Sequence, residues 1–181
     1  MARGNLKCFI SKIKKMKLLA NEINTIAVFR ALQLGDMLCS VPALRALRKA
    51  YPKAKITLIG LPWAKEFVKR FHHYLDDFIS FPGFPGLPEQ EFDPQQVLQF
   101  LLNMQERQFD LVLQMQGNGS VVNPMIELFQ PKWSAGFWRK EDYCPDVAFY
   151  IEYPDRISEI ERHLLLMTYL EIPLHGAYLE Y

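Results

Sequence analysis

The chain has 181 residues, half of them hydrophobic, which is enough apolar material for one domain with a single core. Its net charge is +1, but six basic and no acidic residues lie at positions 1–20, so the remainder carries 15 basic and 20 acidic side chains, a net charge of −5. An acidic body argues against nucleic acid as a partner.

The cysteines and the apolar segments exclude further classes of protein. Three cysteines stand far apart, with no CxxC pair or His/Cys cluster, so no metal site is indicated. An odd number of cysteines in such a chain is typical of reduced thiols in the cytoplasm. No run of 18 apolar residues predicts a membrane span. Lysines interrupt the first apolar residues too often for a secretory signal.

Residues 1–22 form a basic leader. Its apolar residues follow helical spacing and its lysines lie mostly elsewhere. This pattern predicts an amphipathic helix in peripheral contact with anionic lipid at the inner face of the plasma membrane. The alternative is a poorly ordered leader. Residues 23–181 are predicted to form the folded domain.

The first strand and helix of this domain are predicted within residues 26–50. The apolar run at 26–29 predicts a buried strand, and residues 41–50 repeat apolar side chains at helical spacing. Pro42 leaves two interpretations open. Either Ser40 caps the helix and residues 36–39 form a separate turn, or the helix starts at residue 36 and kinks at the proline.

The rest of the chain alternates between strand-like and helix-like patterns. The further predicted strands are 55–60, 77–81, 109–113, 134–137 and 148–151. The further predicted helices are 63–70, 95–108, 121–130 and 158–170. Residues 81–94 form a loop rich in proline and glycine, in which Phe84 and Leu87 are predicted to be buried anchors, the alternative being a patch that faces a partner. This alternation predicts an open parallel sheet with helices on both faces, a Rossmann-like α/β domain.

Two loops at strand ends carry polar residues in a pattern that fits a ligand site. Gly35 and Asp36 follow the first strand, and Gln116, Gly117 and Asn118 follow a later one. The carboxyl ends of parallel strands meet at one edge, where open α/β sheets bind ligands. Asp36 fits a general base for a sugar hydroxyl, and the second loop fits hydrogen bonds to a polyol. The alternative is that Asp36 caps the next helix and the second loop is an ordinary turn.

The motifs of nucleotide-binding loops are missing from this chain. Neither GxGxxG nor GxxxxGK[ST] occurs. The residues alone therefore support neither a dinucleotide fingerprint nor a phosphate-binding loop.

Four blocks of the sequence resemble the family 9 glycosyltransferases, the heptosyltransferase-like group that builds lipopolysaccharide core. They are FRALQLGDMLCSVPALRALRKAYPKAKITLIG, FDLVLQMQGN, SAGF and EIERHLLLMTYLEIP, in the family's order within residues 25–173. The resemblance implies the GT-B fold, two Rossmann-like domains across a cleft, with the acceptor held largely by the first and the donor by the second. It also implies an inverting transferase that needs no metal or cofactor, a nucleotide sugar such as ADP-heptose as donor, and a glycan or lipid-linked acceptor.

The resemblance also assigns roles to residues. Asp36 falls on the Asp of the family's Gly-Asp motif, its proposed catalytic base. Arg30 falls on its basic position. The residues predicted to hold the acceptor are Arg30, Gly35, Gln116, Gly117 and Asn118.

The chain departs from the family pattern in composition and length. Leu32 stands where the family usually has Gly or Ser, and Gln114 where it usually has Asp, which leaves the acceptor open. Residue 181 falls about where the family's linker to the second domain begins, so we expect the donor-binding domain to be absent from this chain. The alternative function is a non-catalytic binding or assembly module that pairs with a second-domain chain or with itself as a homodimer.

Overall fold

The computed structural model describes residues 22–181, so the predicted leader lies outside the described residues apart from Glu22. These residues form one six-stranded sheet in the order β3-β2-β1-β4-β5-β6, with every neighbouring pair parallel. The strands are β1 (Thr25–Phe29), β2 (Lys55–Gly60), β3 (Asp77–Ser80), β4 (Leu111–Gln114), β5 (Trp133–Trp138) and β6 (Tyr150–Glu152). The predicted open parallel sheet is confirmed.

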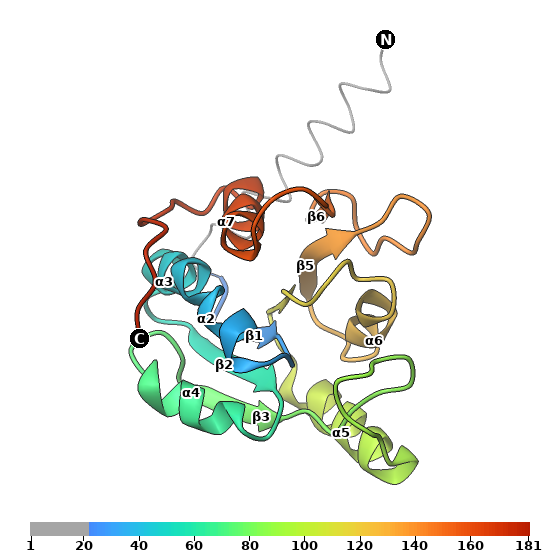
Figure 1. The fold of residues 1–181 in the computed structure, drawn as a ribbon. Coiled ribbons are helices and arrows are strands. Elements are labelled where there is room, and N and C mark those ends of the chain that lie inside the picture. Colours follow the sequence, from blue (N-terminus) through green and yellow to red (C-terminus); the bar gives the residue numbers. More distant parts are fainter. Residues whose placement is uncertain (1–21) are drawn as a thin grey trace.

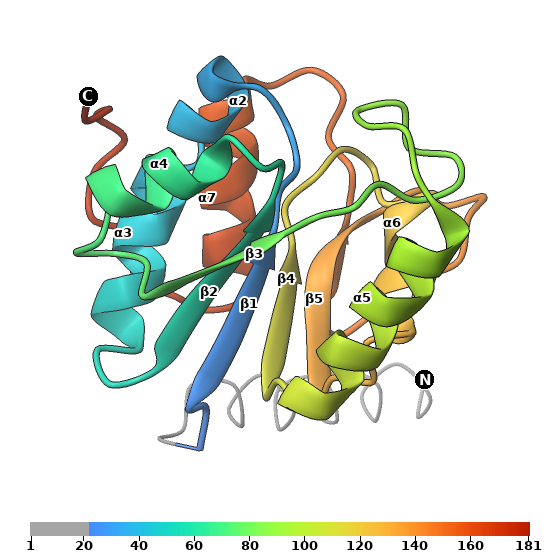
Figure 2. The ribbon, with the colours of Figure 1, turned by 90° about the horizontal axis from the view of Figure 1, so that it is seen from below.

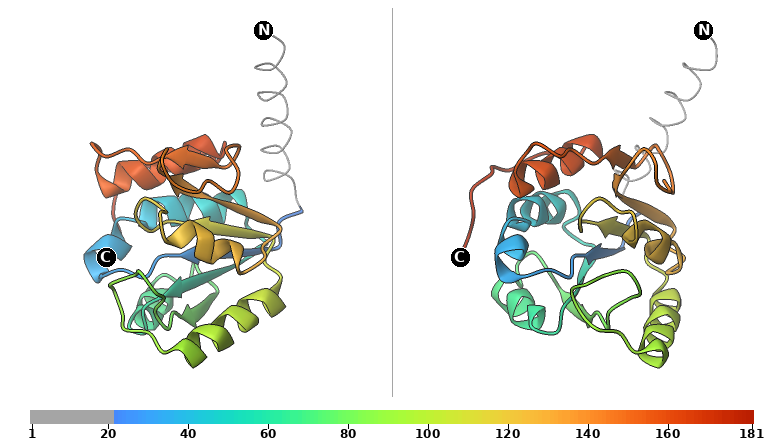
Figure 3. Two further views of the ribbon diagram at one scale, coloured as in Figure 1. Left: turned by 90° about the vertical axis from the view of Figure 1, so that its right-hand side faces the viewer. Right: turned by 45° about the vertical axis from the view of Figure 1, so that its right-hand side comes forward.

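Helices cover both faces of the sheet (Figure 1). They are α2 (Leu34–Leu38), α3 (Val41–Ala50), α4 (Ala64–Arg70), α5 (Pro94–Arg107), α6 (Val122–Glu127) and α7 (Glu159–Tyr169). The helices α3, α4 and α7 lie on one face, and α5 and α6 on the other (Figures 2 and 3). The predicted Rossmann-like arrangement with helices on both faces is therefore confirmed. None of the helices within the described part is long and apolar enough to cross a membrane.

The central strand β1 shows why the strands appear as unbroken apolar runs in the sequence. Ile26 and Val28 pack into the core beneath α3, α4 and α7, whereas Ala27 and Phe29 pack into the core beneath α5 and α6. Successive side chains of a strand point to opposite faces, and here both faces are covered. All four of these side chains are buried.

The structure decides between the two interpretations of Pro42. A short helix, α2, precedes a separate helix, α3, and Pro42 lies in the first turn of α3, where its missing N–H leaves no partner unsatisfied. Ser40 occupies the cap position, but its Oγ donates to the Met37 carbonyl at 2.6 Å and not to α3. The first interpretation is confirmed in starting a separate helix after Ser40, but Ser40 makes no capping side-chain bond to α3, and the predicted turn is wrong because residues 34–38 form a helix.

The end of α6 differs from the expected one. This helix stops at Glu127, three residues before the predicted end. The N–H groups of Leu128 and Phe129 donate to carbonyls three residues back, and Gln130 has a left-handed backbone with φ of 54°. The tighter turn and the left-handed residue end the α-helix ahead of Pro131.

The proline- and glycine-rich loop between β3 and α5 packs on the domain. Phe84 and Leu87 are partly buried and pack against the core beneath α5 and α6. The prediction that they anchor the loop is confirmed. The loop lies at the end of the sheet where the strands terminate (Figure 2).

Candidate active site

The two polar loops predicted to form a site lie side by side. β1 leads into α2, which carries Gly35 and Asp36, and the neighbouring strand β4 leads into the loop with Gln116. The N–H of Ala31 donates to Gln116 Oε1 at 2.6 Å and joins the two loops. Both follow the carboxyl ends of adjacent parallel strands, the usual location of a ligand site in such a sheet.

Asp36 has a backbone held by hydrogen bonds from Arg30 and a carboxylate that remains available to bind a ligand. The residue is half-buried, in the first turn of α2. Its backbone carbonyl accepts bonds from Arg30 Nε at 3.1 Å and Arg30 Nη2 at 2.8 Å. Within residues 22–181, its carboxylate forms no hydrogen bond or ion pair with the protein. A cap for its own helix would bond backbone N–H groups, so the capping interpretation has no support in these contacts.

Arg30 is the central polar residue beneath the site. Its side chain is fully buried at the end of β1. Besides Asp36, the guanidinium donates to the carbonyl of Met115, to Glu159 Oε2 at 3.0 Å and to His163 Nε2 at 3.0 Å. All five N–H donors of the guanidinium therefore have acceptors within the protein.

The charge of Arg30 persists despite its burial. Burial lowers the pKa of Arg30 to about 10, against the opposing effect of the Asp36 charge. The side chain is a cation at neutral pH and fixes the backbone of α2 relative to β4 and α7. Its predicted contact with an acceptor stays a prediction, and the bonds present make it a positioning residue.

His163 completes this buried cluster from α7. Burial, followed by the nearby charge of Arg30, lowers the pKa of His163 to about 3. The imidazole is therefore neutral, with Nε2 accepting from Arg30 and Nδ1 facing the Cys39 carbonyl at 3.4 Å. A neutral acceptor fits beside the arginine, where a second cation would be repelled.

Gln116 also uses its side chain within the protein. It is buried, its Oε1 accepts from Ala31, and its Nε2 donates to Glu89 Oε1 at 2.9 Å. Gln114, also buried, supports this loop by donating to the Gln116 carbonyl and accepting from the Phe137 N–H at 3.1 Å. The predicted contact of Gln116 with an acceptor stays a prediction.

Gly117 and Asn118 border a small pocket at this edge. The pocket has a volume of about 180 Å³, with Leu87 and Glu89 on its other side. Gly117 has φ of 55°, and an added Cβ there would meet nothing within 4 Å. An added Cβ at Gly35 would also meet nothing within 4 Å. Both glycines therefore leave room for a ligand to approach the backbone.

Asn118 is tied to its own loop. Its Oδ1 accepts from the N–H of Ser120 at 3.0 Å and from Ser120 Oγ at 2.9 Å. These bonds fix the turn while its amide nitrogen stays available as a donor. Its predicted role in holding an acceptor stays a prediction.

Sequence reasoning missed Glu89, which the loop before α5 brings to this pocket. Its Oε2 is enclosed and has no hydrogen-bond partner among the described residues, while Oε1 is held by Gln116. The only signal was an acidic residue in a loop at the carboxyl edge of the sheet. Within the described part of the chain, no group of three or more His, Cys, Asp or Glu side chains is placed to hold a metal ion.

Solved structures resemble this domain in fold, although the sequence comparisons found no match. No family model and no curated protein matches the sequence. A glycosyl transferase family 9 structure from Veillonella parvula DSM 2008 aligns with a TM-score of 0.67 and 16% identity, covering 87% of this chain and 45% of that chain.

Two structures of the E. coli heptosyltransferase WaaC also match. The complex with ADP gives a TM-score of 0.57 at 17% identity, covering 83% of this chain and 48% of that chain. The complex with ADP-2-deoxy-2-fluoro heptose gives 0.56 at 16% identity, covering 84% and 51%. The chain thus spans about half the length of the solved structures it matches. The fold of residues 22–181 therefore resembles the N-terminal half of the family 9 glycosyltransferases.

Proposed function

We propose that this chain is the acceptor-side half of an inverting glycosyltransferase of the family 9 type. The observation that carries the proposal is Asp36: its carboxylate has no partner within the described protein, and its backbone is held by a buried arginine at the carboxyl edge of the sheet. The resemblance in fold to half of the family 9 structures supports the proposal.

In this mechanism Asp36 acts as the general base. An Asp36 carboxylate oxygen takes the proton of an acceptor hydroxyl, and the oxygen of that hydroxyl attacks the anomeric carbon of a nucleotide sugar from the face opposite the leaving group. The bond from the anomeric carbon to the phosphate oxygen breaks, the nucleoside diphosphate leaves, and the configuration inverts. The acceptor is a glycan or lipid-linked glycan held by the loop at Gly117 and Asn118.

The donor site belongs to a second Rossmann-like domain in this proposal. Groups of that domain would stabilise the departing diphosphate, as preorganised donors do at other centres of developing charge. The domain would be supplied in the same polypeptide or by a second chain. The alternative, a non-catalytic assembly module, predicts that Asp36 is dispensable in the assembled complex.

The test is Asp36→Asn in the assembly that contains this chain and a donor domain. Sugar transfer from radiolabelled nucleotide sugars to cell-envelope glycolipids should fall by about 10²–10⁴-fold, the usual contribution of a general base. The fold should stay intact, as judged by circular dichroism and thermal unfolding.

The control is Asp155→Asn, which removes a carboxylate from an exposed ion pair with Arg139. Transfer by this variant should stay within about twofold of the unmodified protein, because exposed ion pairs contribute little. Undiminished transfer by the Asp36 variant would eliminate the base assignment and favour the assembly module.

A further inference from the structure

The small pocket at the loop after β4 has a single charged side chain in its lining. It lies between the loop before α5, which supplies Leu87 and Glu89, and the segment 116–122. Among the described residues that line it, Glu89 alone is charged at neutral pH, and the others are glycines, amides, a serine and apolar residues. Its volume of about 180 Å³ is below that of sites that enclose a drug-sized ligand. We therefore expect it to receive one group of a larger ligand.

Glu89 has one oxygen that the protein leaves without a partner. Its Oε1 accepts from Gln116 Nε2 at 2.9 Å, whereas Oε2 is enclosed and has no hydrogen-bond partner within residues 22–181. An enclosed carboxylate is normally paired with a cation or with several donors, because burying its charge is costly. The terminal torsion of a glutamate is broad, so the carboxylate can turn toward the pocket while the rest of its side chain stays in place. Oε2 can therefore bind a ligand that supplies a donor.

The pocket is joined to the segment that leads to Asp36. Gln116, whose Nε2 holds Glu89, accepts the Ala31 N–H with its Oε1 at 2.6 Å. Ala31 lies between β1 and α2, the helix that carries Asp36. An added Cβ at Gly117 would meet nothing within 4 Å, so a ligand can approach the backbone there. One side-chain amide therefore connects the pocket to the segment that positions the candidate base.

The charge of Glu89 distinguishes between ligands. A protonated amine neutralises a lone carboxylate and donates to it, and such charge-assisted bonds are about twice as strong as bonds between neutral groups. A hydroxyl donates without neutralising the charge, and a phosphate or carboxylate is repelled by it. The pocket therefore favours an amine over a hydroxyl and over an anionic group.

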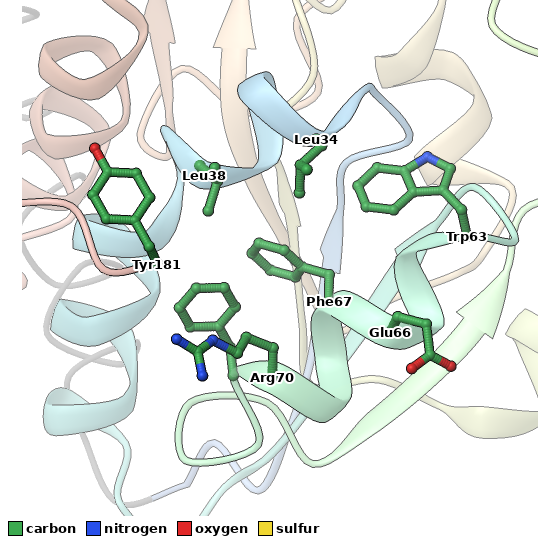
Figure 4. A pocket seen from close by; sticks show the side chains of 8 residues that line it. Leu34, Leu38, Trp63, Glu66, Phe67, Arg70 and Tyr181 are labelled. Atoms are coloured by element: carbon green, nitrogen blue, oxygen red, sulfur yellow. The ribbon is translucent and has the colours of Figure 1, made fainter.

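The larger pocket between α2 and α4 has no such preference (Figure 4). Its volume is about 430 Å³, and its walls are mostly apolar. The two charged residues in the described part of its lining, Glu66 and Arg70, have opposite signs. Of these two pockets, the one at Glu89 is therefore the one whose charge indicates a class of ligand.

We propose that Glu89 binds a protonated amine of the acceptor, so that the acceptor contains an amino sugar whose amine is free. This inference rests on the proposed function, because it takes the pocket as part of the acceptor site. It specifies the class of acceptor: a glycan that places an unacetylated amino group in the pocket. Glycans that present only hydroxyl, N-acetyl or carboxylate groups there should bind more weakly.

The experiment titrates the full chain with three trisaccharides and follows its ¹H–¹⁵N NMR signals at about pH 6.5, where amino groups are protonated. The trisaccharides are those of glucosamine, of N-acetylglucosamine and of galacturonic acid. The Kd for the glucosamine trisaccharide should be about tenfold or more below the other two, a difference that one charge-assisted bond can supply. The amide signals of Gly117 and Asn118 should shift.

The matched variants are Glu89→Gln and Glu91→Gln, which remove the same charge from the same loop. Glu91 is exposed and does not line this pocket. Glu89→Gln keeps an oxygen that can accept from Gln116, so the loop should stay in place. The preference of Glu89→Gln for the glucosamine trisaccharide should fall to within about twofold, whereas Glu91→Gln should keep the preference.

Four outcomes would overturn the inference: equal binding of the three trisaccharides, an unchanged preference in Glu89→Gln, equal losses in the two variants, or no binding of the glucosamine trisaccharide at about 10 mM. The transfer test has a separate outcome. A preference that depends on Glu89, together with undiminished transfer by Asp36→Asn, would keep the amine site and remove the proposed function. Loss of transfer in Asp36→Asn without any preference for the amine would remove this inference alone.

Discussion

A single buried arginine organises the residues around the candidate base. Arg30 directly follows β1 and donates to the Asp36 carbonyl of α2, the Met115 carbonyl beyond β4 and Glu159 of α7. A buried cation is tolerated only when its charge and donors are satisfied, and here all five donors are. Removing it would leave buried acceptors without partners.

We therefore expect Arg30→Met to lower the free energy of unfolding by about 3 kcal/mol or more, since each abandoned buried acceptor costs about 1–3 kcal/mol. Urea unfolding followed by circular dichroism measures this change. Arg107→Met is the control, because Arg107 forms surface contacts with Asn103 and Asp77, and it should cost below about 1 kcal/mol. Equal losses in the two variants would contradict the organising role of Arg30.

The neutral state of His163 predicts how stability depends on pH. In the unfolded chain an imidazole takes up a proton near its usual pKa of 6.5, whereas His163 in the folded protein has a pKa of about 3 because it is buried. Between these values the unfolded state binds more protons, so the free energy of unfolding falls as pH falls from about 6.5 toward 3.

His163→Gln keeps an amide oxygen that can accept from Arg30 and removes the titrating group. Its free energy of unfolding should depend less steeply on pH between 6.5 and 4 than that of the unmodified protein. Urea midpoints measured across this range give both slopes. The exposed His72→Gln variant is the control, and a slope in His163→Gln as steep as that of the control would show that the imidazole is not kept neutral by the fold.

Among the strands and helices, the sequence patterns predicted nearly all of the ends to within a few residues of the observed ones. Strands buried on both faces appear as short apolar runs. Pro94 lies in the first turn of α5, where its missing N–H leaves no carbonyl without a partner, and Pro52 follows the end of α3, which a proline cannot continue. The end of α6 was missed because it depends on a switch to a tighter turn at Leu128 and a left-handed residue at Gln130, which apolar spacing does not report.

The cap at the start of α7 lies next to a residue that contacts the buried arginine of the candidate site. Ser158 caps this helix by accepting the Glu161 N–H at 3.2 Å, and Glu161 returns a bond to the Ser158 N–H at 2.9 Å. Glu159, which follows Ser158 in the chain, pairs with Arg30. The cap therefore fixes the carboxylate that faces the buried guanidinium.

Ser158→Ala should lower the free energy of unfolding by about 1 kcal/mol, the usual cost of losing a capping side chain. Amide exchange should quicken most at the start of α7. The exposed Ser80→Ala variant at the end of β3 should change stability by less than about 0.5 kcal/mol. Unchanged exchange in the first turn of α7 would show that the cap does not hold it.

At the scale of the whole molecule, the sequence predicted the layers but not the contacts between distant segments. The Gln116–Glu89 bond and the Arg45–Glu180 pair join residues 27 and 135 positions apart. Such pairs depend on how the layers close and have no local pattern. The sequence predicted that Arg30 touches an acceptor. Its bonds to α2, to the residue after β4 and to α7 join distant segments, so the sequence could not reveal them.

The whole domain bears on the proposed function through the polar residues at the carboxyl edge of its sheet. Its polar loops offer a carboxylate, two open glycines and an amide, which suit the hydroxyls of a glycan. The motifs that bind nucleotide phosphates are missing from the sequence. In the proposed function this domain holds the acceptor, and another domain holds the donor.

The most direct test of that claim is binding to residues 1–181 alone, measured by ¹H–¹⁵N NMR titration with lipid-linked glycans and, separately, with ADP-sugars and other nucleotide sugars. We expect a glycan to shift the amide signals of Gly35, Asp36, Gly117 and Asn118. We also expect every nucleotide sugar to bind with a Kd weaker than about 1 mM, which corresponds to about −4 kcal/mol. Micromolar binding of a nucleotide sugar at these loops, without any response to glycans, would contradict it.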